Sequence, residues 1–268
     1  MIRKLLQRGA GRIIREFRRA RGGPVAGRGD RKLIVHCAHH RVGSAWFTRV
    51  LRAIADEYGL HFQNCDQVDL QRDTDVFLQD HSLVDLARLP PHRGSHMIRD
   101  PRDVVVSRYF FHLWTKESWA HDPQAEYGGR SYLEYLNSLD QEAGILAEID
   151  KFADYGLAHM ANWNYANPDF LELRYEEIIR DEEGVFRRLF THYGFGPAAV
   201  ERSVQIAKQF SFERQTKRKV GQVQAKSHLR SGRPGEWRDV LSDRQKARCK
   251  AVFGDVLVTL GYETGYDW

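Results

Sequence analysis

The alternation of short apolar segments with helical segments, beginning at Lys32, constrains the fold more than any other feature of this sequence. Short apolar runs predict buried strands, and longer segments with apolar residues at helical spacing predict helices. The predicted strands cover residues 32–37, 76–78, 95–98 and 170–175, and the predicted helices cover residues 46–58, 101–114, 182–193 and 243–260. This alternation is typical of a parallel sheet covered on both faces. We therefore expect an α/β fold, a single domain with a central parallel sheet flanked by helices.

The N-terminal segment differs from the rest of the chain in its charge. Residues 1–32 contain eleven basic and two acidic residues, a net charge of +9, whereas the whole chain carries +5. The remainder is therefore slightly acidic, which argues against a protein that binds nucleic acid over its whole surface. A basic amphipathic pattern runs through residues 1–21 and gives way to a Gly-rich linker. We expect residues 1–29 to be an extension and linker, and residues 30–268 to be the folded domain.

The basic extension has three interpretations. It is a helix that is solvated or packed on the domain, a peripheral helix attracted to anionic lipid, or a cleavable targeting peptide, although it contains no serine. Three scattered cysteines (Cys37, Cys65 and Cys249) do not make a disulfide framework, which fits a reducing compartment. We expect a cytoplasmic protein, with residues 1–21 as a candidate contact with a membrane surface.

The junction between the first predicted strand and helix, residues 39–46, is a candidate phosphate-binding site. A turn from a buried strand into a helix presents backbone N–H groups and the positive end of the helix dipole to an anion. Gly43 lets a phosphate approach the backbone, Ser44 offers a hydroxyl, and Arg41 offers a permanent charge. The segment lacks the Gly-Lys-Ser/Thr ending of a Walker A loop. An ordinary strand–helix turn also often carries Gly and Ser, so this segment alone does not distinguish a phosphate-binding site from an ordinary turn.

A second candidate site lies in residues 96–109. Asp100 is placed to cap a helix that begins at Pro101. Arg99 ends a predicted strand, where ligands bind in open α/β sheets. Ser107 follows about two turns into the helix. The alternative is a plain strand-to-helix turn with a surface arginine. The occurrence of residues 39–46 and 96–109 together and in this order favours a phosphate-binding site over that alternative.

The two segments resemble the signature segments of the PAPS-dependent sulfotransferases. In that family a Lys-Ser-Gly-Thr-Thr-Trp loop binds the 5′ side of 3′-phosphoadenosine 5′-phosphosulfate (PAPS), and an Arg-(Asn/Asp)-Pro-(Lys/Arg)-Asp…Val-Ser segment binds its 3′-phosphate. Residues 170–177 resemble the family's strand that ends in Tyr-Glu-(Asp/Glu). Residues 211–212 resemble its Ser-Phe stretch, and residues 230–237 resemble its Arg-Lys-Gly-x-x-Gly-x-Trp loop, which closes over the 3′-phosphate. The resemblance runs from about residue 32 to residue 262.

The resemblance implies a P-loop-like donor site made from several parts of the chain. The implied donor contacts are Arg41, Val42, Gly43, Ser44, Ala45, Trp46, Arg99, Ser107, Tyr175, Phe212, Arg230, Ser231 and Gly232. Trp46 and Phe212 would sandwich the adenine. Three positions depart from the family pattern: Arg41 and Gln79 stand where the family has lysines, and Ala45 stands where it has a threonine.

The resemblance also implies roles in sulfuryl transfer by in-line displacement. His81 aligns with the family's catalytic histidine, and an imidazole with a pKa of about 6.5 suits a general base. Asp80 is the alternative base. Arg41 would place charge at the bridging oxygen, but arginine cannot donate a proton there as lysine can.

The function expected from this resemblance is transfer of a sulfuryl group from PAPS to a hydroxyl or amine. The products would include adenosine 3′,5′-bisphosphate (PAP), and the acceptor would be a small molecule, a lipid or a glycan. We expect no metal, because the residues of the His36–His40 segment alternate in direction as they leave the strand. We expect no nucleic-acid partner, and the sequence does not indicate the oligomeric state. The alternatives are a P-loop-type kinase and a non-catalytic protein that binds membranes or polyanions through residues 1–21.

Overall fold

The structure is a computed structural model that describes residues 32–268, so the expectations for residues 1–29 lie outside the described chain. The described chain forms two compact units. The first unit contains residues 32–98 and 164–215, and the second contains residues 99–163 and 216–268. Among residues 32–268, no helix combines the length and the apolar character needed to cross a membrane.

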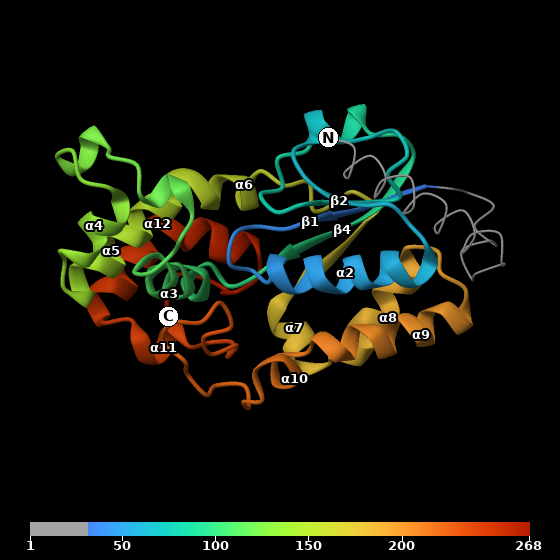
Figure 1. The fold of residues 1–268 in the computed structure, drawn as a ribbon. Helices are drawn as coiled ribbons and strands as arrows, with labels where there is room; N and C mark the ends of the chain where they lie inside the picture. Colours follow the sequence, from blue (N-terminus) through green and yellow to red (C-terminus); the bar gives the residue numbers. More distant parts are fainter. Residues whose placement is uncertain (1–31) are drawn as a thin grey trace. The chain divides into compact units, whose positions relative to one another are not determined.

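A five-stranded parallel sheet forms the centre of the first unit (Figure 1). Its strands, in the spatial order β2-β3-β1-β4-β5, are β2 (Phe62–Asn64), β3 (Val76–Gln79), β1 (Leu33–Cys37), β4 (His92–Ile98) and β5 (Phe170–Arg174). Strands β1 and β3 are buried along their whole length, as expected for inner strands of a parallel sheet. Strands β3 and β4 follow each other in the chain but lie on opposite sides of β1, so the sheet reverses its winding direction at β1, and ligands bind at such switch points.

The helices of the first unit follow the strands. They are α2 (Ser44–Tyr58), α7 (Tyr175–Arg180), α8 (Glu182–His192), α9 (Pro197–Ala207) and α10 (Phe212–Thr216), with short 3-10 turns at Gln67–Asp69, Leu86–Arg88 and Lys208–Phe210. Helix α2 buries an apolar face and ends at Gly59, whose left-handed backbone (φ 65°) caps its C-terminus. Helix α2 packs against α9, and α9 against α8 (Figure 1).

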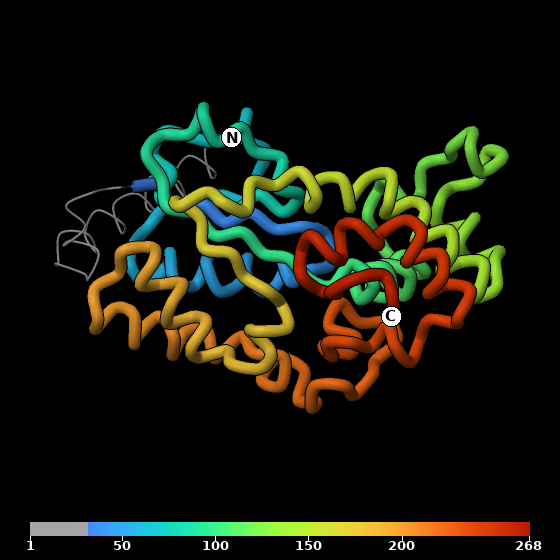
Figure 2. The backbone as a smooth tube through the Cα atoms, turned by 180° about the vertical axis from the view of Figure 1, so that it is seen from behind, coloured from blue at the N-terminus to red at the C-terminus, as the bar shows by residue number. Residues whose placement is uncertain are grey.

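The second unit is helical. It contains α3 (Pro101–His112), α4 (Tyr132–Asn137), α5 (Gln141–Phe152), a π-helical turn (Ala153–Leu157), α6 (Ala158–Ala161), α11 (Trp237–Val240) and α12 (Asp243–Thr259), with 3-10 turns at Ser118–Ala120 and Ala125–Tyr127. Asp100 caps α3 by accepting a hydrogen bond from the backbone N–H of Arg102, and Pro101 is the first helical residue, as predicted. Helix α12, near the C-terminus, packs against α3 and α5 (Figure 2).

A buried ion cluster holds α3 to α5 in this unit. Glu148, which is fully buried, accepts hydrogen bonds from Arg108 Nε (3.1 Å), from Tyr132 Oη (2.6 Å) and from Nδ1 of His112. Burial alone would raise the pKa of Glu148, but the charges of His112 and Arg108 outweigh it and lower the pKa to about 2. The carboxylate therefore stays ionised inside the unit and fixes the two helices.

The expected α/β fold with a central parallel sheet is confirmed, and each predicted strand and helix is present. Several boundaries differ from the prediction by a few residues, and two differences have a clear local cause. Tyr175, expected at the end of a strand, instead begins α7, whose first turn carries two glutamates that favour a helix N-terminus. Strand β2 was not predicted, because its three residues are half-buried or exposed at the edge of the sheet and lack an apolar pattern.

Candidate active site

The loop after β1 leads into a helix whose N-terminus has no side-chain cap. Gly43, the N-cap residue of α2, has a φ of 121°, and the first turn of α2 contains no acidic residue. A φ in this range is strained for any residue with a side chain, so the turn favours glycine there, and a Cβ atom would also lie 2.9 Å from Cε of Met97. Arg41 also has a positive φ, 68°. The loop therefore turns sharply and leaves the N–H groups and the positive dipole end of a 15-residue helix to attract an anion.

The other residues predicted for this part of the site differ in exposure. Val42 is buried, Gly43 and Ser44 are half-buried, and Ala45 is exposed. Tyr175 Cδ2 lies 3.6 Å from the Cβ position at Gly43, so the structure brings Tyr175 to the loop. Trp46 is 7% exposed and packs against Phe186, with ring centroids 5.7 Å apart.

Phe212, the other residue of the predicted adenine sandwich, is the first residue of α10 and is 8% exposed. Both aromatic rings therefore belong largely to the core of the first unit. Adenine stacking by Trp46 and Phe212 stays a prediction.

The loop after β3 carries the predicted base and is tied to the loop after β1. Gln79 is buried, and its Oε1 accepts hydrogen bonds from the backbone N–H groups of His81 (2.9 Å) and Leu83 (3.0 Å). Ser82 Oγ donates to the carbonyl oxygen of Ala38, 2.8 Å away. Gln79 stands where the family has a lysine, and the structure shows that its side chain fixes the turn that presents His81.

His81 itself is partly open to solvent. Its side chain is 53% exposed, and Nε2 lies 3.7 Å from Oδ1 of Asp80, the alternative base. The His81 ring also lies over the ring of His40, with centroids 6.5 Å apart. The loops with Arg41 and His81 follow the carboxyl ends of the neighbouring strands β1 and β3. The arrangement places a cation, a helix N-terminus and an imidazole at one edge of the sheet.

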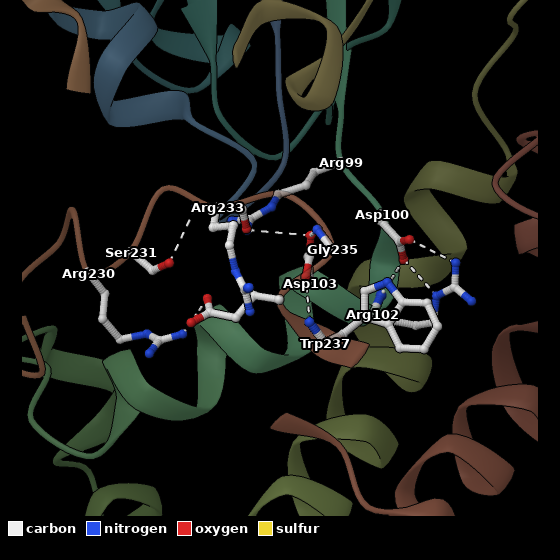
Figure 3. A network of polar contacts seen from close by, with 10 residues as sticks. Arg99, Asp100, Arg102, Asp103, Arg230, Ser231, Arg233, Gly235 and Trp237 are labelled. Carbon is white, nitrogen blue, oxygen red and sulfur yellow. Dashed lines mark hydrogen bonds and ion pairs between the residues drawn. The ribbon is translucent and has the colours of Figure 1, made fainter. Parts of the chain in front are cut away.

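The second predicted segment is built around the carboxylate of Asp103 (Figure 3). This buried side chain accepts hydrogen bonds from the backbone N–H groups of Gly235 (2.6 Å) and Trp237 (2.9 Å). Burial raises the pKa of Asp103, although the nearby Arg99 charge opposes the shift. Arg99 Nη2 lies 3.7 Å from Asp103 Oδ2 and donates to the carbonyl oxygen of Arg233 at 3.5 Å. Asp103 therefore holds the 230–237 loop against the start of α3.

The 230–237 loop gathers further polar groups beside Arg99 (Figure 3). Arg230 forms an ion pair with Glu236, and its guanidinium lies 4.2 Å from the ring centroid of Phe110. Ser231 Oγ accepts a hydrogen bond from the backbone N–H of Arg233 at 3.3 Å. Gly232 has a φ of 69°, and Ser107 is half-buried on α3. The structure thus brings Arg99 together with the loop that the sequence predicted for the same phosphate.

Arg102 lies beside this segment and is entirely buried (Figure 3). Its guanidinium lies 3.8 Å from the ring centroid of Trp237 and 4.3 Å from that of Trp268. It also forms ion pairs with Asp100 and Glu263. Two stacked aromatic rings and two carboxylates fix this arginine, which makes it a structural support for the 230–237 loop.

Three polar residues, His39, His96 and Glu172, meet beneath the loop after β1, and the sequence does not predict this contact. His39 Nε2 lies 2.9 Å from His96 Nε2, and His96 Nδ1 lies 2.7 Å from Glu172 Oε2. A signal was present, because His96 and Glu172 are polar residues inside predicted strands, where burial requires a partner.

The His36–His40 segment engages in hydrogen bonds of this kind. His36 Nδ1 lies 2.7 Å from Ser95 Oγ, which in turn lies 2.6 Å from the hydroxyl of Tyr193. Among residues 32–268, no group of three or more His, Cys, Asp or Glu side chains is arranged to hold a metal ion.

An anion-attracting loop at the switch point of a parallel sheet defines an α/β protein of the kind that handles phosphate-bearing ligands. The family profile described as "Sulfotransferase domain" matches residues 93–261, well over half of the chain. The chain therefore belongs to the sulfotransferase domain family and is a sulfotransferase by class, as the resemblance of its motifs indicated. No curated protein sequence matches the chain significantly.

Solved structures with the same fold include a mouse enzyme. The crystal structure of mouse sulfotransferase SULT7A1 complexed with PAP superposes on this chain with a TM-score of 0.57. The two sequences are 13% identical, and the match covers 85% of this chain and 86% of the mouse chain. Retinol dehydratase in complex with androsterone and inactive cofactor PAP is 14% identical, with coverage of 84% and 80% and a TM-score of 0.48. The mouse structure confirms the fold class.

Proposed function

We propose that the protein transfers a sulfuryl group from PAPS to a hydroxyl or amine of a small-molecule, lipid or glycan acceptor. One observation carries the proposal: in a chain of this family, Asp103 joins Arg99 to the 230–237 loop, as a site for the donor's 3′-phosphate requires. The shared fold with a mouse sulfotransferase that binds PAP supports the same donor.

Each unit has its own proposed contacts with the donor. In the first unit, the turn at Arg41 and Gly43 and the N-terminus of α2 would bind the 5′-phosphosulfate. In the second unit, Arg99, Ser107 and the loop from Arg230 to Gly232 would bind the 3′-phosphate. Arginine suits this task because its planar fork makes paired, charged hydrogen bonds to phosphate oxygens.

The proposed reaction is an in-line displacement at sulfur. The acceptor oxygen or nitrogen bonds to sulfur as the bond from sulfur to the bridging oxygen breaks, and that electron pair leaves on the 5′-phosphate of PAP. Fixed charge from Arg41 would stabilise the leaving group. His81 would take the acceptor's proton, with Asp80 as the alternative base. The hydrogen bonds that the backbone N–H groups of His81 and Leu83 donate to Gln79 Oε1 support His81 in this role, since they fix its backbone.

Calorimetric titration with PAP tests the donor site. Arg41→Ala and Arg99→Ala should each weaken PAP binding about 10- to 150-fold, since one charged hydrogen bond contributes about 1.5–3 kcal/mol. Arg248→Ala is the matched control, because Arg248 is half-exposed and pairs with Asp150 on the surface. Undetectable binding of PAP to the wild-type protein, or unchanged affinity in both site variants, contradicts the proposal.

The base role is tested by turnover with PAPS and an acceptor found by mass-spectrometric screening. His81→Ala should lower kcat by about 10²- to 10⁴-fold and leave PAP affinity within about twofold. Retained activity assigns the proton to Asp80 or another group, which Asp80→Asn tests in turn. Turnover in the presence of EDTA separates this enzyme from a P-loop kinase, which needs Mg²⁺.

We also propose that residues 30–268 form the sulfotransferase domain of a cytoplasmic enzyme, with residues 1–29 as an extension that contacts membrane surfaces. The concentration of positive charge in residues 1–21 supports membrane contact. Deletion of residues 1–21 should abolish sedimentation with anionic liposomes and preserve PAP binding. If the deletion removes PAP binding instead, the extension belongs to the catalytic domain.

A further inference from the structure

A single arginine lies at the centre of the segment that precedes the 230–237 loop. Residues 216–229 contain four basic side chains and no acidic one. Three of the basic side chains, those of Lys217, Lys219 and Lys226, are exposed, whereas Arg218 is half-buried. A charged side chain that leaves solvent needs hydrogen-bond acceptors. Since this segment offers no carboxylate, Arg218 has to find its acceptors elsewhere.

The backbone supplies acceptors for this guanidinium. Nη1 of Arg218 donates to the carbonyl oxygen of Arg230 at 2.8 Å and also to that of Gln222. Nη2 of Arg218 donates to the carbonyl oxygen of Leu229. Because the guanidinium is planar and carries several N–H donors, it can hold these carbonyl groups at the same time. Arg218 therefore joins the beginning of the segment to its end, immediately before the residues proposed to bind the 3′-phosphate.

Two backbone hydrogen bonds close the same loop. The N–H group of Gly221 donates to the carbonyl oxygen of Ser231 at 2.8 Å, and that of Gln224 donates to the carbonyl oxygen of Arg230 at 2.9 Å. The carbonyl oxygens of three consecutive residues, 229–231, thus accept hydrogen bonds from residues 218–224. In a trans peptide the N–H group points opposite to the C=O group, so the N–H groups of residues 230–232 are directed away from these donors.

The orientation of these peptide groups matters for an anion. Carbonyl oxygens repel a phosphate, whereas successive backbone N–H groups can form a concave site that attracts one. Arg218 turns the carbonyl groups to its own side of the loop and so leaves the N–H groups of residues 230–232 on the other side. Farther along the chain, Asp103 accepts hydrogen bonds from the N–H groups of Gly235 and Trp237. Residues 230–232 therefore lie between two anchors, Arg218 before them and Asp103 after them.

We propose that Arg218 is a positioning residue for recognition of the donor's 3′-phosphate, because it fixes the peptide groups of residues 229–232 before the donor binds. The proposal rests on the donor site proposed above. Arg218 acts through the backbone carbonyl groups of Leu229 and Arg230 and makes no contact with the phosphate itself. A loop that is already ordered in the free protein loses less conformational entropy on binding, so it binds its ligand more tightly.

Calorimetric titration with two nucleotides separates this role from a general loss of folding. PAP and adenosine 5′-monophosphate (AMP) differ only in the 3′-phosphate, so the ratio of their dissociation constants isolates the affinity that this phosphate contributes. The wild-type protein should bind PAP about 100-fold more tightly than AMP, since several charged hydrogen bonds reach the 3′-phosphate. Arg218→Ala should weaken PAP binding about tenfold or more and leave AMP binding within about twofold.

Two further variants distinguish the geometry of Arg218 from its charge. Lys219→Ala is the matched control, because it removes one positive charge from an exposed position of the same loop, and it should keep the wild-type ratio of PAP to AMP affinity. Arg218→Lys keeps the charge but lacks the planar fork, so it should lose most of that ratio. A wild-type ratio in either Arg218 variant, or an equal loss in Lys219→Ala, overturns the proposal. Equal affinity of the wild-type protein for PAP and AMP would instead count against the proposed donor site itself.

Amide hydrogen exchange in the wild-type protein, followed by nuclear magnetic resonance, provides a test that needs no folded variant. Without ligand, the N–H groups of Gly221 and Gln224 should exchange at least about tenfold more slowly than in an unfolded peptide, because the loop around Arg218 is already closed. Addition of PAP, but not of AMP, should slow the exchange of residues 230–232. Unprotected N–H groups at Gly221 and Gln224 in the free protein would show that the loop is not prepared in advance and would refute the role of Arg218. Equal protection of residues 230–232 by both nucleotides would contradict their contact with the 3′-phosphate.

Discussion

The carboxylate of Asp103 offers a measurable link between stability and donor binding. It accepts two backbone hydrogen bonds, from Gly235 at 2.6 Å and from Trp237 at 2.9 Å. Asp103→Asn preserves the shape of the side chain but replaces one acceptor oxygen with a donor, so one of these N–H groups loses its partner. A hydrogen bond to a charged group contributes about 1.5–3 kcal/mol, and a buried polar group left unsatisfied costs about 1–3 kcal/mol. We expect the free energy of unfolding to fall by about 2–4 kcal/mol.

Urea unfolding followed by tryptophan fluorescence measures this loss, and calorimetry with PAP measures its effect on the site. The matched control is Asp239→Asn, because Asp239 is 66% exposed and pairs with Arg233 on the surface. Exposed pairs of this kind contribute about 0–1 kcal/mol. If Asp103→Asn is as stable as this control, the two backbone hydrogen bonds do not hold the loop. If stability falls while PAP affinity stays unchanged, the loop does not serve the 3′-phosphate.

Two further predictions concern buried charges in the second unit. The pKa of Glu148 is about 2, below its ordinary value of 4.5, so its ionised form contributes stability that is complete above pH 4.5 and is lost as the pH falls toward 2. In Glu148→Gln, the free energy of unfolding should therefore depend less on pH between pH 5 and pH 2. The same acid dependence in this variant as in the wild-type protein would contradict the assignment. Trp268→Ala removes one of the two rings stacked on Arg102, so urea titrations should show a free energy of unfolding lower by about 1–2 kcal/mol. An unchanged free energy of unfolding would show that this ring does not stabilise the unit.

The sequence was sufficient to predict the elements that carry strong local patterns. The buried strands β1 and β3 each begin with three consecutive apolar residues, and α3 begins after a capping aspartate with proline as its first residue, so neighbouring residues alone specify them. The edge strand β2 has no such pattern, since its side chains are not buried. Tyr175 was placed in the preceding strand because nothing in the apolar run marks its end.

The site was predictable as a set of segments but not as a set of contacts. Arg99 and the 230–237 loop were predicted together from the family resemblance, and Asp103 joins Arg99 to this loop through Gly235 and Trp237. The role of Gln79 could not be inferred, since its partners are backbone N–H groups placed by the turn that it stabilises. His39, His96 and Glu172 are separated by 57 and 76 positions, and only the strand order makes them neighbours.

The three polar residues beneath the loop after β1, His39, His96 and Glu172, also bear on how the sheet acquires its strand register during folding. Their contacts are complete only when His96 of β4 is opposite Glu172 of β5. A slip of β5 by one residue would place Leu171 or Leu173 beside His96 and leave a fully buried imidazole without its carboxylate. Apolar strands alone tolerate such slips more readily, because one leucine can replace another. The three polar residues therefore make the correct alignment of β1, β4 and β5 energetically distinct from its nearest alternatives, and this difference favours the native register as the sheet assembles.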